Sequence, residues 1–331
     1  TCCFSRKAIR QKRFREEFYS RKSPGTAEKT STGGRLVSGV ANHLFEHARR
    51  FLNLGDEERI AYIRAPRWVG HQVAQGSHQR LTELLNRPAS LRTQGLMLVG
   101  PYANGKTMIA ERFAVEHLRG SSNQRVWIVQ TREGAGLGHF YASILQALHA
   151  PGGDIWNVSR KAEQLDHLLA SIKPRVLIFD EFHNALRGRS RDVEGVFAFL
   201  RRIGRQYDIS PVLVGEVAIY DFVNATSEMA TRFELVPIPR WQYDESYLML
   251  LDSLEAALPL AKASDLSDET LARRIFSLSE GLIGEIVSVV TKAAVMALRS
   301  GAERITETCI DELGYISISH RRNASLRKQL I

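Results

Sequence analysis

Cysteine is scarce in this 331-residue chain, and its placement excludes a disulfide framework. The three cysteines are Cys2 and Cys3, which are adjacent, and Cys309, which is far from both. Disulfide-rich domains and zinc sites need spaced sets of cysteine or histidine ligands, so neither class fits. We expect each cysteine to have a structural role at most.

Long apolar runs are also missing. No stretch approaches the roughly 20 apolar residues that cross a bilayer, and charges interrupt the first 30 residues, where a signal peptide has an apolar core. We therefore expect a cytoplasmic protein without a membrane partner. Hydrophobic residues make up 44% of the chain, which is enough to bury a full core.

The net charge of +9 lies mainly at the two ends. Residues 1–50 carry 12 Lys/Arg and four Asp/Glu, residues 316–331 carry four Lys/Arg and no acid, and the body between them is near neutral. Such ends either steer a protein toward a polyanion or are solvated tails, and both interpretations stay open. Residues 1–40 are predicted to form a disordered basic arm and residues 316–331 a basic tail.

The chain contains one complete sequence motif, because residues Gly100–Thr107 match the pattern G-x-x-x-x-G-K-T. An apolar run, Leu96–Val99, precedes it and an apolar-faced helix follows, which is the context of a phosphate-binding loop. The glycines allow a tight turn, the backbone N–H groups face an anion, and Lys106 reaches the β and γ phosphates. We expect the nucleotide to contact Gly100, Tyr102, Ala103, Asn104, Gly105, Lys106, Thr107 and Met108.

A second apolar run, Val176–Phe179, ends in paired acids and forms a Walker B segment. Asp180, at the end of a central strand, is expected to share a Mg²⁺ ion with Thr107. Glu181 is expected to polarise the water that attacks the γ phosphate. Alone, such an acid pair is more often a solvated helix cap; about 75 residues after a full phosphate loop it indicates a site.

Strands and helices alternate along the middle of the chain. Besides the run before the phosphate loop and the Walker B run, strands are predicted at 125–130, 211–215 and 233–238, and only helices follow residue 240. The pattern predicts an α/β fold, a P-loop NTPase with a doubly wound, five-stranded parallel sheet and a C-terminal helical lid. The predicted domains are a helical lead-in at 41–95, the nucleotide-binding domain at 96–240 and the lid at 241–315.

Together these motifs resemble the AAA+ ATPases, and more narrowly the TniB/TnsC-type ATPase subunits of transposition systems. The closer match is carried by segments in a fixed order: Arg59–Arg64, Arg67–Gly70, Asn104–Ile109, Ile178–Asn184, Arg232–Glu234, Pro239–Trp241 and Glu280–Val287. The phosphate loop and Walker B are generic to many NTPases. The segments D-E-F-H-N, R-F-E and G-x-x-G-E-I-V are specific to TniB.

The resemblance implies ATP as the cofactor, beside the Mg²⁺ expected at Thr107 and Asp180, and assembly of a homo-oligomeric ring or filament around duplex DNA. It also implies recruitment of a transposase (TniA-like), with a TniQ-like adaptor as a further candidate partner. Arg232 matches the arginine finger that reaches the γ phosphate of a neighbouring subunit, although an ordinary surface arginine is the alternative. No Asn-Lys-x-Asp guanine signature occurs, which agrees with adenine.

Two departures from the family pattern bear on hydrolysis. Glu216 follows the fourth strand, where relatives usually place a small polar residue such as threonine. Gly284 and Glu285 stand where many AAA+ proteins have a sensor arginine. Both departures predict slow turnover.

Two loops are candidates for contacts with duplex DNA. Arg132 follows the second strand, and Arg187, Arg189 and Arg191 follow Walker B. A solvated helix start is an equal alternative for the latter three.

Three functions are compatible with these observations. The first is an ATP-dependent, DNA-binding transposition regulator that assembles on target DNA and recruits the transposase, with hydrolysis controlling disassembly. The second is a nucleotide-gated scaffold with little turnover. The third is an initiator-like or clamp-loader-like replication ATPase, which the short segment after the lid disfavours.

Overall fold

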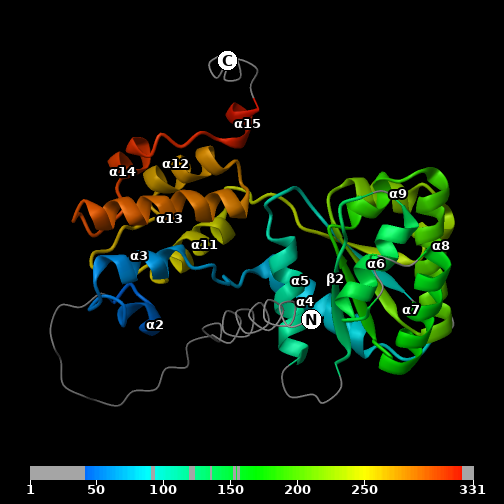
Figure 1. Ribbon diagram of the computed structural model, residues 1–331. Coiled ribbons are helices and arrows are strands. Elements are labelled where there is room, and N and C mark those ends of the chain that lie inside the picture. The colour runs from blue at the N-terminus through cyan, green and yellow to red at the C-terminus, as the bar shows by residue number, and fades with distance from the viewer. Residues whose placement is uncertain are drawn as a thin grey trace. The chain divides into compact units, whose positions relative to one another are not determined.

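The computed structural model describes residues 42–90, 94–118, 124–134, 136–151, 154 and 157–322 (Figure 1). The chain divides into two compact units: a sheet unit of residues 72–239, and a helical unit that combines the segment up to His71 with the segment from Arg240. The predicted basic arm, 1–40, lies outside the described residues, as do residues 323–331 of the predicted tail. No helix in the described part of the chain is long and apolar enough to cross a membrane.

The sheet unit is built on five parallel strands, as predicted. Their order is β2-β3-β4-β1-β5, so β1 lies between β4 and β5. The pairing aligns Leu98 of β1 with Val214 of β4 and with Val236 of β5. The strands are β1 Gly95–Val99, β2 Val126–Gln130, β3 Val176–Asp180, β4 Ser210–Gly215 and β5 Phe233–Pro237.

Burial explains which strands are apolar throughout. The central strands β1, β3 and β4 are buried at every residue, whereas the edge strands β2 and β5 alternate buried with more exposed residues. Covered parallel strands need apolar side chains on both faces, which accounts for the continuous runs in the sequence. Because all five strands run the same way, their carboxyl ends share one edge of the sheet, where the predicted nucleotide residues follow β1, β3 and β4.

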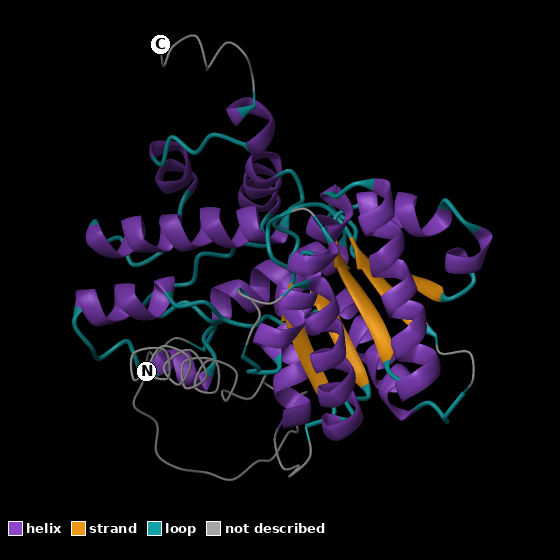
Figure 2. Ribbon diagram, turned by 45° about the vertical axis from the view of Figure 1, so that its right-hand side comes forward, coloured by secondary structure: helices purple, strands orange, loops and turns teal. Residues whose placement is uncertain are grey.

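Helices cover both faces of this sheet (Figure 2). One face packs in a core that includes Met97, Phe140, Leu165 and Phe199. On the other side α5 packs against α4 and the strands. The helices of the unit are α4 Gln72–Asn86, α5 Lys106–Leu118, α6 Leu137–Ala147, α7 Val158–Ile172, the 3-10 helix η1 Phe182–Arg187, α8 Ser190–Tyr207, α9 Ala218–Asn224 and α10 Ser227–Ala230.

The helical unit has its own core, which includes Ile60, Tyr247, Ile275 and Val289. Its helices are α2 Glu46–Arg49, α3 Asp56–Arg64, α11 Glu245–Ala256, α12 Glu269–Ser279, α13 Ile283–Arg299, α14 Glu307–Glu312 and α15 Ile318–Arg321. The segment 41–95, predicted as one lead-in, is divided here: α2 and α3 lie in the helical unit and α4 in the sheet unit. Ile60 and Ile63 explain this placement, because both are buried in the helical core.

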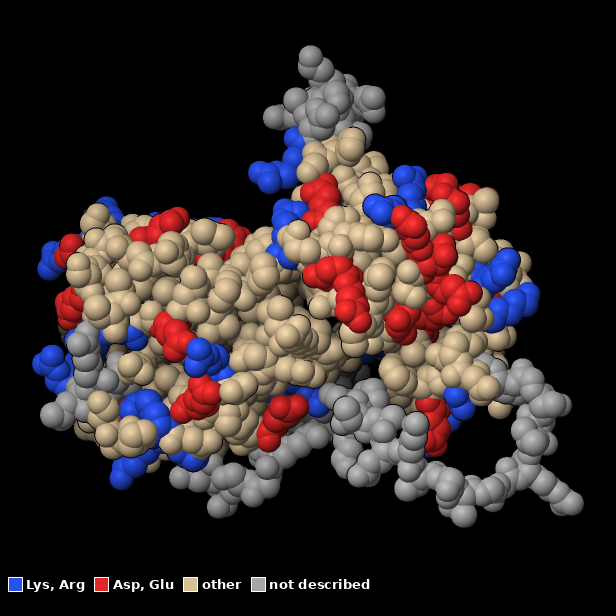
Figure 3. All heavy atoms as spheres, turned by 180° about the vertical axis from the view of Figure 1, so that it is seen from behind, with Lys and Arg blue, Asp and Glu red and all other residues tan. Residues whose placement is uncertain are grey.

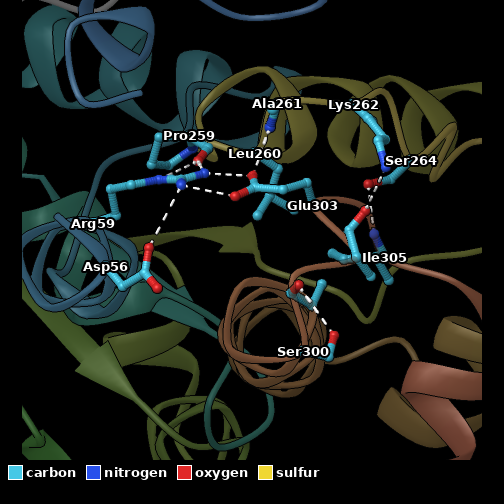
Figure 4. Close-up of polar contacts among 12 residues, drawn as sticks. Asp56, Arg59, Pro259, Leu260, Ala261, Lys262, Ser264, Ser300, Glu303 and Ile305 are labelled. Carbon is cyan, nitrogen blue, oxygen red and sulfur yellow. Dashed lines mark hydrogen bonds and ion pairs between the residues drawn. The ribbon is translucent and has the colours of Figure 1, made fainter. Parts of the chain in front are cut away.

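Arg59 fastens α3 to two loops of the helical unit (Figure 4). Its guanidinium donates to both carboxylate oxygens of Glu303, at 2.8 and 2.5 Å, and to the carbonyl of Pro259 at 2.6 and 3.2 Å. Glu303 also accepts the backbone N–H of Ala261 at 2.9 Å. A buried arginine is tolerated where its donors are paired in this way, so the contact fixes the position of α3.

Candidate nucleotide site

The phosphate loop joins β1 to α5, and its backbone explains the two glycines of the motif. A Cβ atom at Gly100 would lie 2.2 Å from the carbonyl oxygen of Ile238, so only glycine fits there. Gly105 has φ 80° and Ala103 has φ 56°, both in the left-handed region. Glycine adopts this region without strain, which lets the loop turn into the helix.

Asn104 anchors the loop to the chain that follows β5. Its side-chain amide donates to the carbonyl of Ile238 at 2.9 Å and to that of Pro239 at 2.6 Å, and the residue is 4% exposed. Tyr102 is 72% exposed by contrast, and Met108 is partly buried in the first turn of α5. Among the predicted nucleotide contacts, Asn104 therefore has a structural function as well.

Lys106, the first residue of α5, turns back into the loop. Its ammonium group donates to the carbonyls of Gly100 at 3.0 Å and Pro101 at 2.6 Å, and the residue is 7% exposed. Burial lowers the pKa of Lys106, against the raising effect of the acids Glu181, Glu216 and Asp180. The lysine thus stands where a phosphate cradled by the loop would meet it.

The structure brings Thr107 and Asp180 together, as the motifs predict. The Thr107 hydroxyl donates to Asp180 Oδ1 at 3.3 Å, and the backbone N–H of Glu181 donates to the same oxygen at 3.0 Å. Asp180 is 2% exposed, and this burial raises its pKa to about 6, with the nearby Glu181 adding to the rise. The hydrogen bonds from Thr107 and Glu181 lower the pKa of Asp180 only in part, because burial and the negative charges of Glu181 and Glu111 raise it.

This donor set fits a magnesium ion. A hydroxyl and a carboxylate are hard oxygen ligands, and Mg²⁺ in nucleotide sites is held by one or two protein ligands together with phosphates and water. A divalent ion would also supply the positive charge that ionised Asp180 lacks. Thr107 and Asp180 are therefore the residues that could hold the metal.

Glu181 directly follows β3 and precedes η1, and it adopts the left-handed conformation with φ 51°. Its carboxylate lies 3.4 Å from His183 Nδ1, in an orientation that makes no hydrogen bond. His183 also lies beside Gly215, at the end of β4. His183 was not among the predicted site residues, and its spacing of two residues from the predicted base was the available signal.

Glu216 follows β4 at the same edge of the sheet. It is exposed, and its negative charge acts on Lys106 together with those of Glu181 and Asp180. Three carboxylates thus act electrostatically on one ammonium group, and their negative charge opposes a further anion at the same place. The slow turnover expected from Glu216 stays a prediction.

Arg232 lies at the end of the sheet where the strands begin, opposite their carboxyl ends. Its carbonyl accepts the N–H of Gly95, the first residue of β1, so a five-residue strand, on the order of 15 Å, separates it from the phosphate loop. Its guanidinium is 3.5 Å from Glu228, which also contacts Arg201 at 3.4 Å. Within one chain the structure does not bring Arg232 to the nucleotide site.

The predicted DNA contacts differ in how their charges are used. Arg132 pairs with Asp154 and donates to the side chain of Gln146 at 2.9 and 3.1 Å. Arg187, Arg189 and Arg191 are exposed, and their guanidinium groups contact no carboxylate within the described ranges. On the face drawn in Figure 3, described Lys and Arg side chains are scattered among Asp and Glu.

The segment Glu280–Val287 of the predicted lid lies in the helical unit, where Gly281 and Glu285 make different contacts. A Cβ atom at Gly281, which has φ 69°, would lie 2.4 Å from the carbonyl oxygen of Trp241. Glu285, in the first turn of α13, accepts hydrogen bonds from the Tyr315 hydroxyl and from Arg321, both at 2.7 Å. Glu285, the predicted counterpart of a sensor arginine, thus binds an arginine of α15.

Three solved structures share this fold. The ORC2 protein of Aeropyrum pernix in its ADPNP–ADP complexes aligns with a TM-score of 0.57 and 14% identity, over 76% of this chain and 69% of that chain. Cdc6p of Pyrobaculum aerophilum has a TM-score of 0.57 and 15% identity, over 77% and 71%. ORC1 of Aeropyrum pernix in complex with DNA has a TM-score of 0.57 and 17% identity, over 82% and 70%. At such identities the likeness establishes the fold alone.

Sequence comparison is more specific. No curated protein matches the chain. The family model described as "Bacterial TniB protein" matches residues 59–243, which is more than half of the chain. The matched span begins at the buried Arg59 and contains the phosphate loop, the Walker B acids and Arg232. The chain therefore belongs to the TniB family.

Proposed function

We propose that this TniB protein is an ATP-dependent, DNA-binding regulator of transposition. It assembles on target DNA and recruits a TniA-like transposase, with a TniQ-like adaptor as a further partner, and slow ATP hydrolysis controls disassembly. The proposal depends chiefly on one observation, the convergence of Lys106, Thr107 and Asp180 at the carboxyl edge of the sheet. Family membership connects that convergence to transposition.

In this proposal each residue has a distinct task. Lys106 would leave the loop carbonyls and bind the β and γ phosphates of ATP, and Thr107 and Asp180 would hold Mg²⁺, which would supply positive charge beside those phosphates. Glu181 orients a water molecule and accepts its proton. Arg232 acts on the nucleotide of a neighbouring subunit, because it is remote from the site of its own chain.

Duplex DNA is the proposed ligand of the assembled protein. The exposed Arg187, Arg189 and Arg191 offer charges that no described carboxylate neutralises, and phosphate contacts of this kind are independent of sequence. The similar ORC1 structure is a complex with DNA, which supports the choice of ligand only through the shared fold.

A nucleotide-gated scaffold is the second candidate, and the acids around Lys106 favour it. Glu181 and Glu216 both place negative charge near the lysine, which opposes the charge that develops on the γ phosphate. In that case ATP sets the assembly state without useful turnover.

The deciding experiment measures ATP binding, turnover and assembly on the full chain with and without duplex DNA. Lys106→Ala serves as the site variant and Lys262→Ala, in the helical unit, as the matched control. We expect DNA-stimulated turnover, and loss of ATP binding in Lys106→Ala alone. DNA-bound assembly with ATP but without phosphate release would favour the scaffold. Wild-type ATP affinity of Lys106→Ala would overturn the site.

Recruitment is tested separately. Purified transposase is added to the protein on DNA beads with ATP, with ADP or without nucleotide. We expect retention with ATP only. Equal retention of the transposase with ATP, with ADP and without nucleotide would show that ATP does not control recruitment.

A further inference from the structure

The helical unit carries an open groove that the proposed ATPase function does not use. The end of α3, the second half of α13 and the segment after α14 line it, with a volume of 470 Å³. Figure 1 shows α3 and α13 side by side, and the two helices pack against each other. The apolar part of its lining, called the floor below, consists of Val295, Met296 and Leu313, and Thr291 and Ser300 also line the groove. Its size is within the roughly 300–1,000 Å³ of ligand pockets.

Three cations surround this floor. Arg64, Lys292 and Arg299 line the groove and are exposed, and none contacts a carboxylate among the residues that the structure describes. Lys292 Nζ lies 4.6 Å from the centroid of the Tyr315 ring, a cation–π contact that holds the amine on this side of α13. The groove is therefore apolar inside and positive at its rim.

Other arginines of the same unit are used differently. Several exposed arginines elsewhere on it form ion pairs, namely Arg240 with Glu280, Arg273 with Glu269, Arg274 with Asp311 and Arg321 with Glu285. The exposed Arg304 and Arg322 contact no carboxylate among the described residues. Helix ends explain part of the rim, because Arg64 and Arg299 are the last residues of α3 and α13, where cations are favourable. Lys292 lies in the middle of α13, so this explanation does not extend to it.

We propose that the groove binds an acidic amphipathic segment of a partner protein. Apolar side chains at helical spacing would cover Val295 and Met296, and carboxylates beside them would meet the three cations. The chain's own ends carry the wrong charge, because residues 1–50 and 316–331 are both basic. Duplex DNA presents mainly charged phosphates on its outer surface, which would leave the apolar floor without an apolar partner. Charge complementarity together with the apolar floor thus selects an acidic peptide.

Peptide selection on the full chain tests this proposal. A displayed library of random 16-residue peptides is selected on wild-type protein and counter-selected on Lys292→Glu/Arg299→Glu. The matched control, Arg273→Glu/Arg274→Glu, makes the same change of charge on exposed positions of α12. Unchanged thermal unfolding of both variants shows that the fold is kept. Binding of labelled winning peptides is then measured by fluorescence anisotropy at two salt concentrations.

We expect winners with Glu or Asp and with Leu, Met or Phe at helical spacing. Their affinity should fall at least tenfold in the groove variant and stay unchanged in the α12 control. Retained binding in Lys106→Ala would show that the groove acts independently of the nucleotide site. Winners without acids, or binding that the groove variant preserves, would overturn the proposal. Competition by duplex DNA, or a groove variant that changes the oligomeric state without peptide, would assign the groove to DNA or to a second copy instead.

Discussion

Thr107 Oγ1 lies 3.3 Å from Asp180 Oδ1, although 73 residues separate them in the chain. The sheet order explains the contact, because only β4 lies between β1 and β3 and all three strands end at the same edge. The contact places a hydroxyl beside a carboxyl that burial makes reluctant to ionise. Substitution of Asp180 should therefore change both metal binding and the stability of the metal-free protein.

Replacing Asp180 with Asn should stabilise the metal-free protein at neutral pH. Folding raises the pKa of this carboxyl from 3.8 to about 6, so the folded chain holds its proton to higher pH than the unfolded chain. Its stabilising contribution is full below pH about 4 and is lost as the pH rises through about 6. The loss amounts to about 3 kcal/mol at most, and Asn keeps the hydrogen bond from Thr107 without the charge.

Urea unfolding at pH 4, 6 and 8 checks this prediction. In EDTA the variant should exceed wild type at pH 8, and the difference should vanish near pH 4. Mg²⁺ with ATP should stabilise wild type but not Asp180→Asn. A difference that is the same at every pH would show that the charge of Asp180 is not its cause.

Replacing Glu181 with Gln should leave ATP affinity nearly unchanged and lower turnover by roughly 10²–10⁴-fold. The amide can hold a water molecule but cannot accept its proton. Binding of a fluorescent ATP analogue and phosphate release are measured on the same preparation. Glu194→Gln, on the exposed side of α8, is the matched control. Normal turnover in Glu181→Gln would exclude it as the base.

Much of the fold could be predicted because buried parallel strands leave a plain signal. The apolar runs 96–99 and 176–179 form β1 and β3. The residues that follow them, Thr107 after β1 and Asp180 at the end of β3, lie in contact at the site. The sequence could not assign α3 to the helical unit. That placement depends on the burial of Ile60 and Ile63 in the helical core and on the contact of Arg59 with Glu303, which is 244 residues away. Local pattern carries no information on such a distant partner.

The site was predictable to a similar extent. The motifs placed Lys106, Thr107 and Asp180, because phosphate binding requires fixed spacing on a strand and a helix. His183 was missed, since its contact with Glu181 arises from the 3-10 turn after β3. The pairing of Arg132 with Asp154 was also beyond reach, because Asp154 follows a separate helix.

Replacing Arg232 with Ala should preserve ATP binding by the monomer and weaken ATP-dependent assembly and turnover. The arginine lies at the far edge of its own sheet, so its proposed target belongs to another subunit. Mixing provides the measurement: Arg232→Ala subunits are combined with Lys106→Ala subunits, which keep the finger but not the site. We expect turnover to recover in the mixture. Failure to recover, when wild-type subunits do support Lys106→Ala assembly, would remove the role across subunits.

The structure distinguishes between the arginines that are candidates for DNA contacts. Arg132 is already neutralised by Asp154, whereas Arg187, Arg189 and Arg191 are exposed without a described acid partner. We therefore expect the triple change Arg187→Ala/Arg189→Ala/Arg191→Ala to weaken ATP-dependent DNA binding much more than Arg132→Ala does.

The salt dependence gives the sharper measurement. Removing one arginine that binds a phosphate should lower the slope of log affinity against log salt by about 1, equally for every DNA sequence. Anisotropy titrations on two unrelated duplexes at several salt concentrations provide this slope, and ATP binding by the triple variant verifies that the site is intact. Deleting residues 1–40 is the competing test, because that arm is basic and can also attract DNA. If the deletion abolishes binding while the triple variant keeps the wild-type slope, the arm and not the loop after Walker B holds the duplex.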